Sequence, residues 1–289
     1  MMKKVVKIIH THSRHWVGNG FPVRSLFSYR PDAQEVSPFL LFDYVGPHFF
    51  EPHTEEKPRG VGLHPHRGFE TVTIVFDGEV SHRDSTGGGG TIGPGDVQWM
   101  TAGGGIIHEE YHSLGFSKTG GPFRAVQLWV NLPQQSKMMP PKYQTIEQNE
   151  IPRVDMAGGS MRIIAGAWGD IQGPAKTHTP MNIWDLKLQA DAKTELVIPK
   201  DHNTLIAVLS GHITIDDQGV GEAEVALLDQ QGDTVLITTD GASSLMILSG
   251  LPIDEPVVGY GPFVMNTEEE IRQAVDDYNN NRFTFAQEQ

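Results

Sequence analysis

The chain has 289 residues, a formal net charge of −14 and no cysteine. The absence of cysteine excludes disulfide bonds, thiolate metal sites and a thiol nucleophile. The negative charge argues against nucleic acid or an anionic membrane as a direct partner. The 32 Gly and 19 Pro residues exceed the average share and follow no collagen period, so they indicate many turns and a β-rich fold.

The N-terminus has a basic start, but its apolar run is broken by Lys7 and is soon followed by His and Arg residues. This pattern is not that of a signal peptide. No apolar run approaches the roughly 18 residues that a membrane helix needs. We therefore expect a cytoplasmic protein.

Strand-like segments dominate the chain, and a proline-rich stretch at 132–142 reads as a linker between two strand-rich blocks. Residues 1–135 are expected to form one domain and residues 136–289 a second. The predicted strands are 70–76, 96–101 and 124–130 in the first block, and 182–188, 205–209, 212–215, 225–228, 234–238 and 244–248 in the second.

One convincing helix is predicted near 267–280, at the end of the chain. Thr267 and Glu270 have the spacing of a capping box. Ile271, Ala274 and Tyr278 then recur at helical intervals, which gives the helix one apolar face.

The two strand-rich blocks resemble each other. Residues 69–78 align without gaps over 202–211, and residues 95–101 align over 232–238. We interpret this as two copies of one β domain.

Two pairs of metal-ligand residue types occur in the first copy. His64 and His66 share one strand face, and His108 and Glu110 share another, because side chains alternate along a strand. Neutral imidazoles with a carboxylate suit a divalent first-row metal. Glu70 is an alternative carboxylate ligand if the strand after His66 is regular, whereas a bulge would turn it aside.

The second copy provides an internal control. In the extended alignment, His64 and His66 lie over Val197 and Pro199, and His108 and Glu110 lie over Leu245 and Ile247. Apolar replacement at all four positions indicates a barrel interior. The second copy is therefore expected to bind no metal there.

Four further residues are candidates for the surroundings of the metal. His112 is either a hydrogen-bond partner of a ligand or a solvated residue at the rim. Trp99 and Met100 have opposite parity on their strand, so only one of them can face the metal. Each is either an ordinary core residue or a residue that packs against the substrate. Arg67 either holds a carboxylate at the barrel mouth or forms a surface salt bridge.

The motifs resemble those of the pirins, which are bicupins. The segments that carry the resemblance are 38–43 (PFLLFD), 64–71 (HPHRGFET), 95–103 (GDVQWMTAG) and 261–266 (GPFVMN). The resemblance implies an all-β fold of two tandem cupin barrels (double-stranded β-helix, or jelly roll) with a short C-terminal helix. It also implies metal only in the N-terminal barrel, with His64, His66, His108 and Glu110 as ligands, which favours Glu110 over Glu70.

The resemblance further implies a dioxygenase of the quercetin 2,3-dioxygenase type, which opens a flavonol-like substrate with O2 and releases carbon monoxide. One divalent metal per chain is expected, Fe(II) first, with Mn, Cu, Ni, Co or Zn as alternatives, and Glu110 as general base. The main alternative is a metal-binding regulator that acts through a protein partner without turnover. A sugar isomerase or decarboxylase on the same scaffold is a third alternative.

Overall fold

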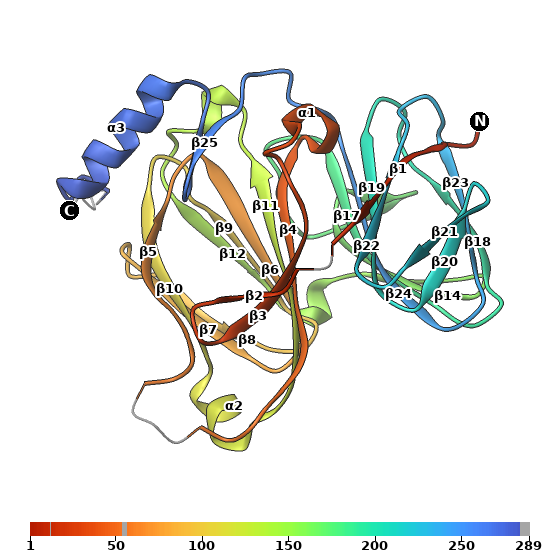
Figure 1. Ribbon diagram of the computed structural model, residues 1–289, viewed down its shortest axis with the longest axis horizontal. Coiled ribbons are helices and arrows are strands. Elements are labelled where there is room, and N and C mark those ends of the chain that lie inside the picture. Colours follow the sequence, from red (N-terminus) through yellow and green to blue (C-terminus); the bar gives the residue numbers. More distant parts are fainter. Residues whose placement is uncertain (12, 54–56, 284–289) are drawn as a thin grey trace. The chain divides into compact units, whose positions relative to one another are not determined.

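The computed structural model describes residues 1–11, 13–53 and 57–283, most of which lie in strands (Figure 1). The chain divides into two compact units. One unit, which we call the C-terminal barrel, comprises Met1–Ser13, Ser25–Phe42 and Asn149–Ile253. The other, which we call the N-terminal barrel, comprises Arg14–Arg24, Asp43–Gln148 and Asp254–Gln289. The expected single boundary at 135/136 is therefore replaced by several. Each unit contains segments from both halves of the chain, and the terminal helix belongs to the N-terminal barrel.

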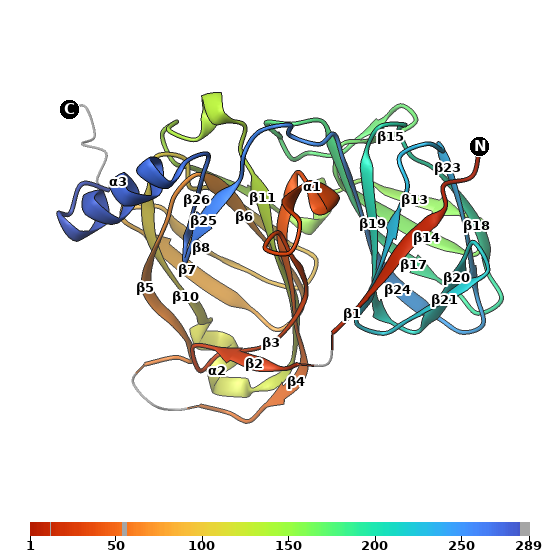
Figure 2. The same ribbon diagram turned by 45° about the horizontal axis from the view of Figure 1, so that its top comes forward.

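The strands of the N-terminal barrel lie in two sheets (Figures 1 and 2). The larger sheet has the order β12 (Lys142–Ile146), β9 (Val97–Thr101), β6 (Phe69–Asp77), β11 (Gly121–Asn131), β4 (Phe39–Phe50), β3 (Phe21–Ser28) and β2 (His15–Val17). This sheet includes the whole of β3 and β4, although residues 25–28 and 39–42 of these strands are counted with the other unit. The smaller sheet has the order β5 (Gly60–His66), β10 (Ile106–His112), β7 (Val80–Asp84) and β8 (Gly89–Ile92). The short helix α2 (Leu114–Thr119) follows β10.

The C-terminal barrel repeats this plan. Its larger sheet has the order β1 (Val5–His10), β22 (Glu224–Leu228), β19 (Asn203–Ser210), β24 (Ser243–Gly250), β17 (Met181–Leu188), β14 (Gly159–Ala165) and β13 (Arg153–Met156). Its smaller sheet has the order β18 (Lys193–Val197), β23 (Thr234–Thr239), β20 (His212–Ile215) and β21 (Gln218–Gly221). The remaining elements of this unit are α1 (Ala33–Val36), β15 (Ala167–Trp168) and β16 (Ile171–Gln172). Every strand that the sequence predicts is present.

The predicted duplication is confirmed by the strand orders, but one of the two sequence alignments is wrong. β6 and β19 occupy equivalent places, as the alignment of 69–78 with 202–211 requires. The counterpart of β9 is β22, whereas residues 232–238 lead into β23 and form most of it. The reason lies in the turn before each strand. The left-handed position is Gly95 in one copy and Ala223 in the other, so the Gly-Asp pair that guided the alignment precedes a different strand.

The corrected counterparts of the four candidate ligands follow from the strand register. His108 lies opposite His64, and the equivalent pair in the other barrel is Val235 opposite Leu196. The full set of counterparts, for His64, His66, His108 and Glu110 in that order, is Leu196, Ile198, Val235 and Ile237. All four belong to one hydrophobic cluster and are at most 1% exposed. Val197 is 62% exposed and is therefore not an interior position.

The predicted terminal helix is α3 (Glu268–Asn279), and its capping box is present at Thr267 and Glu270. Ile271 and Ala274 are buried on the apolar face. This face packs on the hairpin of β25 (Val258–Tyr260) and β26 (Phe263–Met265). No helix in the described part of the chain has the length and hydropathy to cross a membrane.

Candidate metal centre

Three histidines meet inside the N-terminal barrel. β5 supplies His64 and His66, and β10 supplies His108, which lies directly opposite His64. One ring nitrogen from each histidine falls within 4.8 Å of the others. Nitrogen atoms that share one ion at about 2.1 Å lie up to about 4.2 Å apart. Small side-chain rotations are therefore enough for the three residues to bind one metal.

The electrostatics of these histidines favour the neutral, ligating form. Burial and, to a smaller extent, the neighbouring His64 lower the pKa of His66 to about 3. Burial, followed by the charges of His66 and His64, holds the pKa of His108 well below its usual range. The pKa of His64 is also lowered by burial, while its Nδ1 lies 2.8 Å from the carbonyl oxygen of Gly62.

Buried ring nitrogens at this site lack hydrogen-bond partners. Within the described residues, both ring nitrogens of His108 and Nδ1 of His66 are without a hydrogen-bond partner. A buried polar atom without a partner is costly, and coordination of a metal would satisfy one nitrogen of each ring. The donor set of neutral imidazoles without thiolates fits a divalent first-row ion.

Glu110 lies two residues after His108 on β10 but outside the close group of three ligand atoms. The ladder between β10 and β5 is irregular between His108 and Glu110. Burial raises the pKa of Glu110 to about 7, and the neighbouring side chain of Thr73 opposes this rise. Thr73 Oγ1 in turn donates to Gln127 Oε1 at 2.7 Å. From this position Glu110 can become a fourth metal ligand if its side chain moves, or it can act as a proton acceptor near the metal.

Glu70 does not join the histidines. β5 ends at His66, the chain turns at Gly68 with a φ of +88°, and Glu70 lies on β6 in the other sheet. Its Oε1 accepts a hydrogen bond from Thr101 Oγ1 at 2.6 Å. Burial raises the pKa of this carboxyl group to about 7, against smaller opposing contributions from Thr101 and Trp99.

Trp99 and Met100 are both at most 1% exposed and face opposite sides of their strand, as alternation requires. Met100 pairs with Thr71, which lies opposite Trp129 on the inward face. Tyr143 Oη lies 2.9 Å from the sulfur of Met100. Trp99 is on the side of Glu70. The structure thus brings Met100, and not Trp99, toward the barrel interior.

His112 is neither a rim residue nor a neighbour of the histidine cluster. Its ring is only 2% exposed, stacks on Phe123 at 4.9 Å and lies 2.9 Å from the carbonyl oxygen of Gly20 through Nε2. Burial lowers its pKa to about 4. The expectation of a solvated residue is wrong because aromatic side chains, Phe116 of α2 among them, enclose this end of β10.

Arg67 is buried at 3% exposure and holds a carboxylate from its own chain. Its Nη1 donates to Asp277 Oδ2 of α3 at 2.8 Å, and its Nε donates to the carbonyl oxygen of Gly104 at 2.7 Å. Phe283 lies under the guanidinium group at 4.4 Å. The surface salt bridge considered for this residue is therefore replaced by a buried one.

Sequence reasoning missed two aromatic neighbours and a further histidine. Trp129 lies 5.6 Å from the ring of His66 and is partly exposed although it faces inward. His82 pairs with Glu110 across β7 and β10 and stacks on Tyr143 at 5.1 Å. The alternation in 80–84, which places His82 on the face of buried Val80, is the signal that could have found it.

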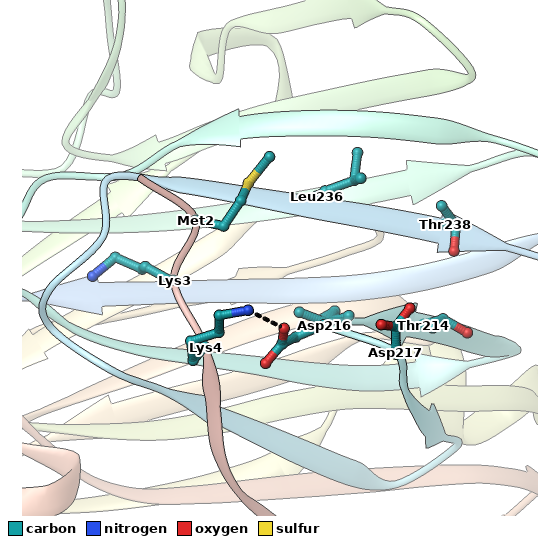
Figure 3. A pocket seen from close by; sticks show the side chains of 9 residues that line it. Met2, Lys3, Lys4, Thr214, Asp216, Asp217, Leu236 and Thr238 are labelled. Carbon is teal, nitrogen blue, oxygen red and sulfur yellow. Dashed lines mark hydrogen bonds and ion pairs between the residues drawn. The ribbon is translucent and has the colours of Figure 1, made fainter.

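A separate cavity of about 230 Å³ lies in the C-terminal barrel (Figure 3). Lys4 Nζ contacts Asp216 Oδ1 at 2.7 Å in its wall, so these two charges compensate each other. The lining contains no histidine and does not resemble a metal site. The lining residues are Met2, Lys3, Lys4, Thr214, Ile215, Asp216, Asp217, Leu236 and Thr238.

Two family models match the chain. The model described as Pirin covers residues 20–130. The model described as Pirin C-terminal cupin domain covers residues 183–284. Together they span both barrels and place the histidine cluster in the first.

Curated relatives and solved structures cover most of this chain. A Pseudomonas aeruginosa protein named "Putative quercetin 2,3-dioxygenase" is 55% identical over 99% of this chain and 100% of its own length. Human "Pirin" is 39% identical over 87% of this chain and 84% of its own. The crystal structure of a quercetin 2,3-dioxygenase from Acinetobacter baumannii has a TM-score of 0.95 at 50% identity, covering 98% of this chain and 99% of that one.

Proposed function

The chain belongs to the pirin family, and from this premise we propose that it is a metal-dependent dioxygenase of the quercetin 2,3-dioxygenase type. In this reaction O2 opens the central ring of a flavonol and one ring carbon leaves as carbon monoxide. The observation that carries the proposal is the cluster of three neutral histidines within 4.8 Å, inside the barrel of a chain with quercetinase-like relatives.

In this proposal His64, His66 and His108 hold one divalent metal, Fe(II), and Glu110 is the fourth ligand. When bound, the metal supplies a Lewis acid for the flavonol oxygen and a partner for O2. The lack of thiolates and the neutral state of the imidazoles support this donor set.

Glu110 is the proton acceptor in the proposed reaction. Its carboxyl group is buried, lies two residues after His108 on β10 and neighbours the side chain of Thr73. A carboxylate in this place takes the proton of the substrate 3-hydroxyl group on one of its oxygen atoms. The substrate then binds as an anion, which suits a site whose only other donors are neutral.

Two aromatic side chains support binding of a flat substrate. The rings of Phe69 and Trp129 lie 4.3 Å apart, and Trp129 is within 5.6 Å of His66. Because the indole is partly exposed in the barrel, it offers a face on which an aromatic ring can stack.

The test is turnover of quercetin by protein that is loaded with metal under anaerobic conditions. Fe(II), Mn(II), Co(II), Ni(II) and Cu(II) are loaded separately, and O2 is then added. We expect loss of flavonol absorbance together with release of one carbon monoxide per quercetin, and neither signal from metal-free protein. Stoichiometric metal without turnover for every ion would contradict the enzyme and favour the regulator that acts through a protein partner.

A further inference from the structure

The residues that follow His66 are tied to the C-terminal segment 262–283, which we call the C-terminal clasp. The backbone N–H of Arg67 donates to the carbonyl oxygen of Pro262 at 3.3 Å, and the N–H of Val264 donates to the carbonyl oxygen of Arg67 at 3.0 Å. Arg67 and Phe263 thus form a short parallel bridge. The strand that carries the two histidines continues directly into this contact.

Lys137 adds a second tie between the same two segments. Its ammonium group is buried and donates to the carbonyl oxygens of Gly68 and Val264 at 2.7 and 2.9 Å, and to Asn131 Oδ1 at 2.8 Å. Gly68 permits the close approach, since a Cβ atom there would lie 2.0 Å from the oxygen of Val264. All three protons of the ammonium group therefore have acceptors.

The ion pair of Arg67 with Asp277 attaches α3 to this point. Arg67 is 3% exposed and Asp277 is 15% exposed, so water screens the pair weakly. Phe283, at the end of the clasp, lies under the guanidinium group. Loss of the carboxylate charge would leave a buried cation without its counterion.

The clasp fixes the backbone directly after His66. Arg67 both donates to and accepts from the clasp through its main chain, so the end of β5 is held on the C-terminal side of His66. Nδ1 of His66 has no hydrogen-bond partner within the described residues, so the clasp acts on this residue through the backbone. Groups that fix the orientation of a metal ligand tune the affinity of the site although they do not touch the metal.

We propose that Asp277 and Arg67 are positioning residues for the metal ligand His66, acting through the backbone of Arg67, which directly follows His66 and is bridged to the clasp. α3 is then part of the metal centre although it supplies no ligand. The inference rests on the proposed three-histidine metal site, but it does not depend on the dioxygenase reaction.

The experiment is anaerobic titration of full-length protein with Co(II), which reports both affinity and ligand geometry through its visible spectrum. Asp277→Asn keeps the size of the side chain and removes its charge. We expect the Kd for Co(II) to rise about tenfold, which is the typical effect of losing a group that orients a metal ligand. The spectrum should change because His66 is reoriented.

Asp276→Asn is the matched control. Asp276 is the adjacent residue of the same helix and pairs with Arg282 at the surface, not with Arg67. Its Kd for Co(II) is expected to stay within twofold of that of the unmodified protein, and its Co(II) spectrum is expected to keep the same shape. Circular dichroism of each variant verifies the fold. If Asp277→Asn does not fold, Phe283→Leu, which removes the ring under Arg67, is expected to give the same spectral change.

The outcomes separate this inference from the proposed function. Co(II) binding by Asp277→Asn with unchanged Kd and spectrum would overturn the role of the clasp and leave the metal centre intact. Failure of the unmodified protein to bind Co(II) at about one ion per chain would overturn the metal centre itself, and the clasp with it.

Discussion

The two barrels have the same strand order and opposite interiors. In the N-terminal barrel, four inward positions on β5 and β10 carry three histidines and a glutamate. In the C-terminal barrel, the equivalent positions on and next to β18 and β23 carry four aliphatic residues of one core cluster. The same scaffold is therefore compatible with a polar site and with a hydrophobic core, and function depends on a few side chains and not on the fold.

The difference has an energetic side. The aliphatic interior stabilises its barrel by burying apolar area. The histidine interior has buried nitrogens without partners, which costs stability in the absence of a ligand. We therefore expect the N-terminal barrel to gain more from a bound metal than from its own packing at this place.

The largest expected effect is that of His108→Val, which gives the N-terminal barrel the residue of its counterpart Val235. Loss of a residue that only orients a metal ligand typically lowers metal affinity by roughly 10–100-fold. Removal of one of the three histidine ligands themselves should lower it by more. Metal content measured by elemental analysis should fall from about one ion per chain to near zero, while the far-UV circular dichroism spectrum is unchanged.

The control for this change is Val235→Ala in the C-terminal barrel. It should keep the full metal content and lower the free energy of unfolding by about 1–3 kcal/mol, because it leaves a cavity in a packed core. Retained metal in His108→Val would show that the ligand set is wrong.

The next largest effect is on the free energy of unfolding, for which we compare Ile237→Glu with Glu110→Ile. A carboxyl group at Ile237 has no polar partner in the aliphatic cluster, so we expect a loss of about 3–5 kcal/mol. Glu110→Ile should be neutral or stabilising, since an apolar residue replaces a buried carboxyl group. Urea unfolding of metal-free protein at neutral pH measures both. Equal losses would contradict the difference between the interiors.

Glu70 provides a pH-dependent comparison, because its counterpart is the neutral Asn203. Burial raises the pKa of Glu70 from 4.5 to about 7. The folded state therefore binds more protons than the unfolded state between these values, and stability falls as the pH rises through this range. The shift corresponds to on the order of 3 kcal/mol.

Glu70→Gln, which makes the position neutral as in the other barrel, should remove this dependence. Relative to the unmodified protein, the variant should gain stability on going from pH 5 to pH 8, up to the amount given above. Urea unfolding of the metal-free proteins at the two pH values measures this gain. Parallel pH profiles would show that Glu70 does not titrate in this range.

The smallest effect concerns the substrate. Trp129→Leu should raise KM for quercetin about 2- to 12-fold, since aromatic stacking contributes about 0.5–1.5 kcal/mol. Its control is Trp168→Leu in the C-terminal barrel, where the ring packs edge-on against Trp184 and KM should not change. An unchanged KM in Trp129→Leu would exclude the indole from the substrate site.

Much of the fold and part of the site could be predicted from the sequence because they depend on local patterns. Strand alternation placed His64 with His66 and His108 with Glu110 on common faces, and turn residues marked the strand ends. The capping box located α3. The alignment of the second barrel failed where Ala223 holds a left-handed turn position that glycine holds in the first, since sequence carries no signal for that exception.

The sequence by itself determined the fold class, the duplication and the pairs of candidate ligands, because side-chain alternation and turn chemistry act over a few residues. Only the tertiary structure decided which side chains meet. It brought His108 opposite His64, turned Glu70 into the other sheet, enclosed His112 among aromatic rings and fixed Arg67 to Asp277, 210 residues along the chain. These outcomes depend on strand register and on contacts between distant segments, which no local pattern encodes.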